Sequence, residues 1–241
     1  MPVALITGGG SLICEGVART LVSRGWHVVV SDINEDSAKY VASVCSGPGS
    51  AEACHLDATK PDQVASVVKS VMDRHGKIDG LLNGAGGGRG IGFPKKDFVD
   101  MERDFYLRML DANLNSMLHV THAVLPHMIA ARSGAIVSIA AGRGLKGGPQ
   151  ASIYSAAKAA IIVFAQSVAQ EVGKYGVRIN TIAPGNAEAR WKAPSAEDLR
   201  SPLGRATNAD DVGKAVAFLL SDDASHITGS CLDISGGTSL H

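Results

Sequence analysis

Tyr154 and Lys158 are the two side chains whose types and spacing point most directly to chemistry. Residues four apart share one face of an α-helix. An ammonium group near a phenol favours the phenolate, so Lys158 is expected to lower the pKa of Tyr154 from about 10 toward neutral pH. Such a tyrosine can exchange a proton with a substrate oxygen. In isolation, the same spacing also occurs in surface residues of amphipathic helices.

A glycine-rich turn near the N-terminus gives a second chemical signal. The glycines Gly8 to Gly10 follow an apolar run and precede Ser11. Glycines between a strand and a helix let backbone amides approach the pyrophosphate of a dinucleotide. The alternative is an ordinary turn between a strand and a helix.

An acidic residue, Asp32, ends the next apolar run, about 20 positions beyond the glycines. A carboxylate at this point is placed to bind both hydroxyls of an adenosine ribose. It would repel a 2′-phosphate, and no Arg or Lys lies in the glycine turn or beside Asp32. NAD is therefore favoured over NADP as the cofactor. The alternative role for Asp32 is to cap a helix that starts near Glu35.

The framework that must position these residues alternates short β-rich runs with helix-length amphipathic stretches. This order predicts an α/β fold, a doubly wound parallel sheet (Rossmann fold) of about seven strands with helices on both faces. No repeat or linker divides the chain, so residues 1–241 are expected to form a single domain. The predicted strands are Val3–Ile6, Val28–Ser31, Ala53–Leu56, Gly80–Leu82, Ala135–Ile139, Val177–Ile182 and Cys231–Ile234. The predicted helices are Cys14–Arg24, Glu35–Val44, Pro61–His75, Met101–Ala131, Ser155–Tyr175 and Asn208–Leu220, with left-handed caps expected at Gly25, Gly76, Gly134 and Gly176.

Taken together, the motifs resemble those of the short-chain dehydrogenase/reductase family over nearly the whole chain. The matching segments are the glycine turn, Asp57, Asn83-Gly84-Ala85-Gly86, Asp111-Ala112-Asn113-Leu114, Tyr154-x-x-x-Lys158, Asn180-Thr181-Ile182-Ala183-Pro184-Gly185 and the tail from Pro202 to Gly237. The resemblance implies that Tyr154 is the catalytic acid/base during hydride transfer at a nicotinamide. It also implies that Lys158 holds the nicotinamide ribose and that Asn113 organises a water for proton relay. The implied cofactor-binding residues are Gly8, Ser11, Ile13, Asp32, Ile33, Asp57, Ala58, Asn83, Ala85, Tyr154, Lys158, Pro184, Gly185 and Ala187.

One departure from the family pattern affects the chemistry directly. The family has a catalytic serine 13 residues before its tyrosine, and this chain has Ala141 there. An alanine cannot donate a hydrogen bond to a substrate oxygen, and the loss of such a donor typically costs about 100- to 1000-fold in rate. Ser138 is expected to point elsewhere, whereas Ser152 is a weak candidate replacement. Three explanations stay open: an altered site with another donor, an engineered Ser→Ala variant, or a binding protein without catalysis.

The cofactor turn departs as well, because Leu12 and Cys14 occupy positions where the family has glycine. Their side chains are expected to crowd the cofactor backbone and to weaken its binding. The segment faintly resembles the divergent enoyl-reductase branch, but the Tyr–Lys spacing differs from that branch. After Gly185, Ala187 and Ala189 replace a β-branched residue and a threonine, which removes one expected hydrogen bond to the cofactor.

The substrate-facing residues predicted from the sequence are Ala141, Arg143 and Ser152, beside a short lid at about residues 186–201. Arginines near the cleft suggest an anionic substrate, because guanidinium groups pair well with carboxylates and phosphates. Solvated surface charges are the alternative. The candidate residues are Arg89, Arg143, Lys146 and Arg190, with Trp191 also in the lid. His119, His122 and His127 have no matching carboxylate cluster, so no metal site is expected.

Composition excludes several classes of partner. The chain has 241 residues with 23 basic and 23 acidic side chains, and its pI is near 7.1. This balance argues against a nucleic-acid-binding protein. We expect no apolar run to reach the roughly 18 residues needed to cross a membrane. Four cysteines without C-x-x-C spacing and an N-terminal strand that follows Met1 directly suggest a reducing, cytoplasmic location. Two helices that are apolar on several faces suggest a homo-oligomer, a tetramer or a dimer.

The sequence therefore predicts an NAD(H)-dependent oxidoreductase that interconverts a secondary alcohol and a ketone, with Tyr154 as acid/base. Two alternatives remain. One is a dinucleotide-binding protein of the same fold with impaired or no catalysis. The other is a reductase of a C=N or C=C bond, for which the missing serine matters less.

Overall fold

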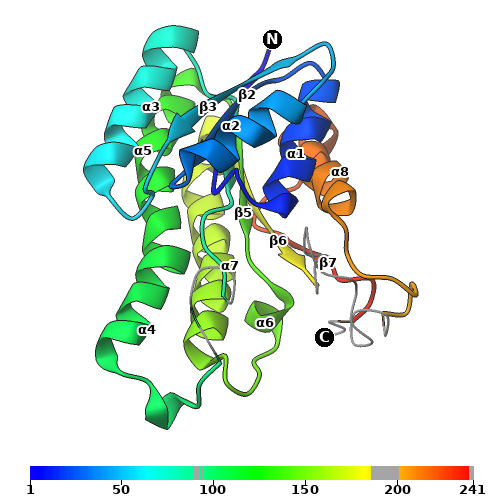
Figure 1. The fold of residues 1–241 in the computed structure, drawn as a ribbon. Coiled ribbons are helices and arrows are strands. Elements are labelled where there is room, and N and C mark those ends of the chain that lie inside the picture. The colour runs from blue at the N-terminus through cyan, green and yellow to red at the C-terminus, as the bar shows by residue number, and fades with distance from the viewer. Residues whose placement is uncertain (89–92, 94, 186–200, 239–241) are drawn as a thin grey trace.

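The computed structural model describes residues 1–88, 93, 95–185 and 201–238. Its centre is one seven-stranded parallel sheet with the order β3-β2-β1-β4-β5-β6-β7, which confirms the predicted doubly wound α/β fold (Figure 1). The strands are β1 (Val3–Thr7), β2 (His27–Asp32), β3 (Ser50–His55), β4 (Gly80–Asn83), β5 (Gly134–Ile139), β6 (Val177–Pro184) and β7 (Cys231–Ile234).

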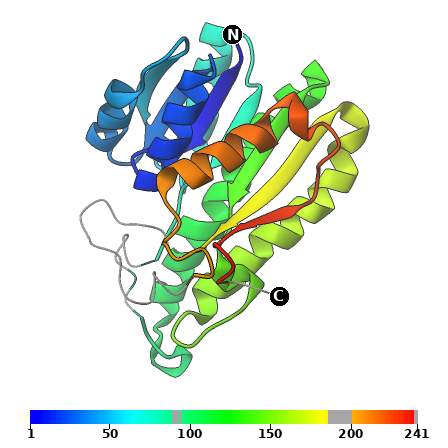
Figure 2. The same cartoon turned by 90° about the vertical axis from the view of Figure 1, so that its right-hand side faces the viewer.

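Helices cover both faces of the sheet (Figures 1 and 2). The α-helices are α1 (Leu12–Ser23), α2 (Glu35–Val44), α3 (Pro61–His75), α4 (Arg103–Leu110), α5 (Ser116–Ala131), α6 (Gly142–Leu145), α7 (Ser152–Val172) and α8 (Ala209–Leu220). The shorter helical elements are η2 (Phe98–Asp100), η3 (Asp111–Asn115), η4 (Gly173–Tyr175) and η6 (Asp222–Ala224). Apolar residues of α1, α2 and α8 pack on one face, and those of α3, α5 and α7 pack on the other.

The run of apolar residues in β1 explains how the sheet separates these two layers. Successive side chains of a strand point to opposite faces. Ala4 and Ile6 accordingly belong to the core beneath α1 and α8, whereas Val3 and Leu5 belong to the core beneath α3 and α5. A strand buried on both faces needs apolar residues at every position, as parallel sheets generally do.

Several predicted element boundaries were wrong. The long predicted helix Met101–Ala131 consists of α4, the π-helical segment η3 and α5, and it begins at Arg103. Helix α7 begins three residues earlier than predicted, at Ser152, and α6 was not predicted. The left-handed cap of α5 is Arg132, with φ of 51°, whereas Gly134 has φ of 155°. Local patterns place helix ends poorly because packing and capping contacts set them.

The apolar composition of α7 has a consequence for the membrane prediction. The helical stretch Ser152–Tyr175 is long and apolar enough to cross a membrane by length and composition alone, so the expectation of no such segment was wrong. Ala165, Val168 and Val172 of this helix lie in the core against the sheet. Packing against a sheet accounts for the apolar character of a helix of this kind.

The strand order reverses between β1 and β4, because β2 and β3 extend the sheet on one side and β5 to β7 on the other. At such a reversal, ligands of doubly wound sheets bind beyond the carboxyl ends of the strands. Figure 1 shows α4, α6 and the N-terminal part of α7 gathered at one end of the molecule.

Candidate active site

The turn between β1 and α1 is held against the loop that follows β4. Gly8 has φ of +62°, and a Cβ on it would lie 2.7 Å from the backbone of Ala85. A residue with a side chain would therefore be both strained and obstructed at this position. The Thr7 hydroxyl oxygen accepts hydrogen bonds from the amides of Gly84 (3.2 Å) and Ala85 (3.3 Å). Gly8 and Ala85, two predicted cofactor residues, thus lie together at the reversal of strand order.

The N-terminus of α1 opens from this turn. Ser11 caps the helix, and its hydroxyl oxygen accepts a hydrogen bond from the amide of Cys14 at 3.3 Å. The amides of Leu12 and Ile13 lie in the first turn, where an α-helix cannot satisfy them internally. Such amides, together with the helix dipole, form a favourable site for a phosphate.

The Asp32 carboxylate closes one side of the same turn. One of its oxygens accepts from the Gly10 amide at 3.0 Å, and the other accepts from the Asn34 amide at 2.8 Å. A Cβ on Gly10 would lie 2.5 Å from Ser37 and 3.1 Å from Asp32 Oδ2, so the backbone approaches the carboxylate closely. The cap of α2 is Asn34, which accepts from the Ser37 amide at 3.0 Å. The alternative in which Asp32 caps this helix is therefore wrong.

The other predicted residues on this side differ in exposure. Ile33 is exposed and Ala58 is buried. One oxygen of the Asp57 carboxylate accepts hydrogen bonds from the amide and the hydroxyl of Thr59. The Asn83 amide group donates to Thr121 Oγ1 (2.9 Å) and to Ser138 Oγ (3.0 Å). The Asn83 side chain thus ties β4 to α5 and β5 from within the core.

Asn113 lies in the π-helical segment η3 and is fully buried. Its side-chain oxygen accepts from the Gly87 amide at 2.8 Å, and its NH₂ group donates to the carbonyls of Gly87 and Met109, both at 3.0 Å. These bonds hold the loop after β4 against the helix. Short π-helical segments are frequent at functional sites, but sequence periodicity gave no sign of this one.

Tyr154 and Lys158 lie in the N-terminal part of α7. Lys158 is 3% exposed, its Nζ donates to the carbonyl of Ile139 at 2.8 Å, and Nζ lies 5.8 Å from the centroid of the Tyr154 ring. Burial lowers the pKa of Lys158 to about 8. Among the described residues, no second hydrogen bond of this ammonium is found, so two of its three donors can serve a bound molecule.

The pKa of Tyr154 departs from its ordinary value in the direction opposite to the prediction. Burial raises this pKa, because the phenolate is poorly solvated there. The Lys158 ammonium lies over the ring and bonds to Ile139. Tyr154 packs against the apolar cluster of Phe93, Phe105 and Met109, which reduces the access of water to it.

Cys14 does not crowd the cofactor turn, which corrects the prediction for this residue. Its side chain is fully buried, with Sγ 4.0 Å from the Thr7 carbonyl oxygen, and a Cβ on Gly84 would lie 2.5 Å from Sγ. Burial raises the pKa of this thiol to about 11, so it is neutral. Leu12 is half-buried at the start of the helix.

The region of the missing serine begins at Ala141, which has an extended backbone and precedes α6. Helix α6 packs closely on α7, since a Cβ on Gly144 would lie 2.7 Å from the Lys158 carbonyl carbon. Ser138 is buried and accepts from Asn83, as stated above. Ser152 is exposed at the first position of α7 instead of in a loop, and Arg143 is exposed on α6.

The end of β6 completes the described part of the site. Pro184 is buried, and the Gly185 amide donates to the Ile234 carbonyl at 3.2 Å. Several predicted residues lie outside the described residues: Arg89, Ala187, Ala189, Arg190, Trp191 and all of the lid except Ser201.

Comparison with known proteins agrees with this geometry. Residues 10–239 match the family model described as "Enoyl-(Acyl carrier protein) reductase". A solved short-chain dehydrogenase/reductase from Mycobacterium ulcerans superimposes with a TM-score of 0.92 and 28% identity, covering 100% of this chain and 90% of that chain.

The chain belongs to the short-chain dehydrogenase/reductase family. It is 34% identical to the 3-oxoacyl-[acyl-carrier-protein] reductase FabG of Chlamydia muridarum, over 97% of this chain and 96% of the relative. It is 35% identical to the oxidoreductase UcpA of Escherichia coli O157:H7, over 98% and 94%. NAD⁺-bound xylitol dehydrogenase superimposes with a TM-score of 0.86 at 28% identity, covering 98% of each chain. Members of this family are oxidoreductases that bind a nicotinamide dinucleotide.

Proposed function

We propose that this family member is an NAD(H)-dependent oxidoreductase that interconverts a secondary alcohol and a ketone. The observation that carries the proposal is the buried Lys158 ammonium beside Tyr154, with a single hydrogen bond among the described residues. A buried ammonium with free donors costs folding free energy unless a ligand uses it. The names of the relatives give related substrates: a 3-oxoacyl group and xylitol.

The preference for NAD rests on Asp32. Its two oxygens accept only backbone amides, from Gly10 and Asn34, and no ion pair with a Lys or Arg is found for it among the described residues. The remaining lone pairs suit the two hydroxyls of a ribose, whereas a 2′-phosphate would meet an uncompensated negative charge. The solved xylitol dehydrogenase is described as NAD⁺-bound, which supports the same preference.

The residues present fit a dinucleotide. The backbone cradle at Gly8 and Gly10, which a side chain would obstruct, would hold the pyrophosphate with the first amides of α1, and Asp32 would hold the adenosine ribose. Lys158 would bind the nicotinamide ribose through its free donors. When bound, the nicotinamide supplies or accepts the hydride.

The protein's own residues handle the proton. Because burial raises the pKa of Tyr154, its hydroxyl is protonated at neutral pH. During reduction, Tyr154 donates this proton to the substrate oxygen as that oxygen gains charge, and solvent then reprotonates the phenolate. During oxidation, the hydroxyl first loses its proton to solvent, and the phenolate oxygen then accepts the proton of the alcohol. Asn113 acts as a positioning residue, because its side chain holds the loop at Gly87. The proposal includes a proton relay through a water held near Asn113.

A second candidate function follows from Ala141, which cannot donate a hydrogen bond to a carbonyl oxygen. Reduction of a C=C or C=N bond depends less on that donor. The family-model description, an enoyl reductase, favours C=C over C=N.

For the substrate, we propose an anionic molecule bound near α6. Arg143 is exposed there, and no ion pair of its guanidinium is found among the described residues. Guanidinium groups bind carboxylates and phosphates with paired hydrogen bonds.

We further propose a homo-oligomer, a dimer or tetramer, formed through α5 and α7, since Val163 on α7 is an exposed apolar residue. Light scattering after size-exclusion chromatography tests the oligomer.

The deciding experiment is a titration of the purified protein with NADH and NADPH, followed by nicotinamide fluorescence. We expect NADH to bind more tightly. Replacement of Asp32 by Ser should weaken NADH binding by about 10- to 100-fold, since one well-formed charged hydrogen bond contributes about 1.5–3 kcal/mol. NADPH binding should improve in the same variant. Asp36→Ser, in the exposed first turn of α2, is the matched control and should leave both affinities unchanged.

Two outcomes contradict the proposal in different ways. Tighter binding of NADPH than of NADH by the unaltered protein would reject the assigned cofactor but not the oxidoreductase. Absence of binding of either dinucleotide would reject the oxidoreductase as well.

A further inference from the structure

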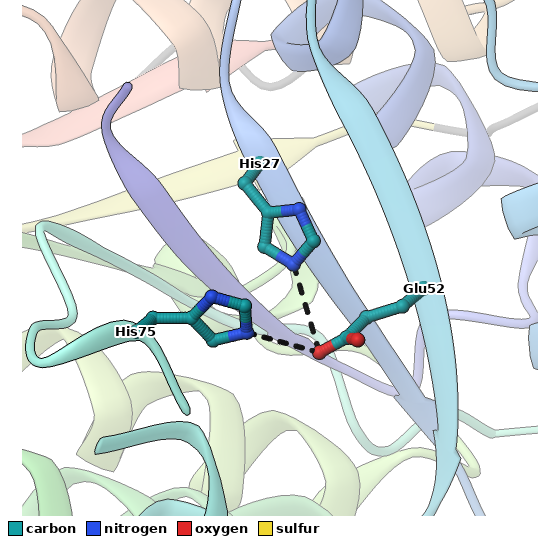
Figure 3. A group of neighbouring side chains, drawn as sticks. All are labelled: His27, Glu52 and His75. Atoms are coloured by element: carbon teal, nitrogen blue, oxygen red, sulfur yellow. Dashed lines mark hydrogen bonds and ion pairs between the residues drawn. The ribbon is translucent and has the colours of Figure 1, made fainter. Parts of the chain in front are cut away.

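Two histidines converge on one carboxylate at the end of the sheet opposite to the proposed active site. His27 opens β2, Glu52 lies in β3, and His75 ends α3. Glu52 Oε1 lies 3.2 Å from His75 Nε2 and 3.6 Å from His27 Nε2. Figure 3 shows both imidazole rings directed at this oxygen. The three ligand atoms lie within 4.8 Å of one another.

The environment of His27 leaves one ring nitrogen available. Its Nδ1 is 2.7 Å from Ser50 Oγ, and its side chain is 12% exposed. Its Nε2 is buried and has no hydrogen-bond partner among the described residues. Metal-binding histidines commonly use one nitrogen for the ion while the other is held by a nearby polar group. His27 has this arrangement, with Nε2 facing Glu52.

Glu52 has one further partner besides the two histidines, the Arg74 guanidinium. Burial acts to raise its pKa, but hydrogen bonds from His75 and Arg74 outweigh burial and hold the pKa below its ordinary value. Arg74 Nη1 donates to both carboxylate oxygens at 2.6 Å. A metal ion on Oε1 would compete with this contact, so Arg74 is expected to weaken metal binding without preventing it.

We propose that His27, Glu52 and His75 form a Zn²⁺ site with a water as the fourth ligand. Two histidines and one glutamate are a frequent zinc ligand set. Ligand atoms about 2.1 Å from a tetrahedral zinc are roughly 3.4 Å apart, which matches the distances of 3.2 and 3.6 Å. The ion would tie the end of α3 to β2 and β3, which no disulfide links because all four cysteines are free.

The test starts with full-length protein stripped of metal by a chelator. Calorimetric titration with Zn²⁺ should show one site per chain, and Co²⁺ at the same site should give the visible absorption bands of a tetrahedral complex. Zinc at about 100 times its Kd should raise Tm by roughly 5–10 °C. His27→Ala and His75→Ala should each weaken binding at least tenfold, whereas Arg74→Gln should strengthen it. His55→Ala, at the exposed end of β3, is the matched control.

Two results would rule out the zinc site. No saturable zinc binding at a large molar excess, or a site that keeps its affinity in both His27→Ala and His75→Ala, overturns the proposal. If His27→Ala does not fold, His75→Ala alone decides, because His75 lies at a helix end. Binding of NADH should be the same with and without zinc, so this test is independent of the proposed function.

Discussion

The first turn of α1 and the start of α6 both depart from the family pattern, but the structure accommodates the two departures differently. At Cys14, the side chain turns inward, where Gly84 leaves room for Sγ, and the backbone of the glycine turn keeps its contact with Ala85. At Ala141, the missing group is a hydroxyl. Ser138 is engaged with Asn83, and Ser152 is exposed at the start of the next helix.

The comparison separates two requirements. A backbone cradle needs space and amides, which repacking of the core can preserve when a glycine is lost. A hydrogen-bond donor at a reacting atom must be at one position, within a few tenths of an ångström, and a neighbouring side chain rarely replaces it. We therefore expect cofactor binding to be near normal and turnover to be limited at Ala141.

The largest expected effect concerns Tyr154, the proposed proton donor. Tyr154→Phe removes the only proposed proton donor and should lower kcat by about 100- to 10,000-fold. Its affinity for NADH should change little, because Lys158 remains in place. Steady-state rates together with the fluorescence titration check both statements; an active Tyr154→Phe enzyme would assign the proton to another group.

Ala141→Ser should restore the missing hydrogen-bond donor to the substrate oxygen. For ketone reduction, kcat/KM should rise by about 100- to 1000-fold. Ala131→Ser, at the exposed end of α5, provides the same replacement away from the site. The gain should vanish in the double variant with Tyr154→Phe. A rate that stays constant or falls in Ala141→Ser would instead favour reduction of a C=C or C=N bond.

The free-energy cost of burying the Lys158 ammonium can be measured as a change in the stability of the folded protein. Lowering of its pKa from 10.5 to about 8 corresponds to a cost of about 3 kcal/mol for the charged folded state. The cost is fully present below pH 8 and is lost as the pH rises from about 8 to 10.5. Lys158→Met should therefore be more stable than the unaltered protein at pH 7, by up to about 3 kcal/mol, and turnover should be lost. Urea unfolding across this pH range, with exposed Lys146→Met as the control, measures the effect.

The smallest expected effect concerns Cys14. Cys14→Ala leaves a small cavity beside Gly84 and should lower the free energy of unfolding by about 1 kcal/mol. NADH affinity should stay within about threefold, because the side chain points away from the turn. A loss of affinity much larger than this would mean that Cys14 shapes the cofactor site directly.

Much of the fold and of the candidate site could be predicted from the sequence. The alternating apolar runs predicted all seven strands, because a parallel strand buried on both faces needs a continuous apolar segment. Motif spacing also predicted that Tyr154 and Lys158 are neighbours, since four residues make about one helical turn. The boundary at Ser152 and the π-helical segment at Asn113 were missed, because they depend on contacts between distant elements.

Local periodicity and short spacings in the sequence were enough to predict the alternation of strands and helices in an α/β fold, the glycine-rich turn after β1, and Tyr154 and Lys158 as neighbours on one helix. The inward direction of Cys14 and the raised pKa of Tyr154 follow from the three-dimensional packing, because solvation depends on the atoms around a group. The same holds for His27, Glu52 and His75. They come from three elements and lie more than 20 residues apart in sequence, and only the pairing of β2 with β3 and the packing of α3 bring them to one point.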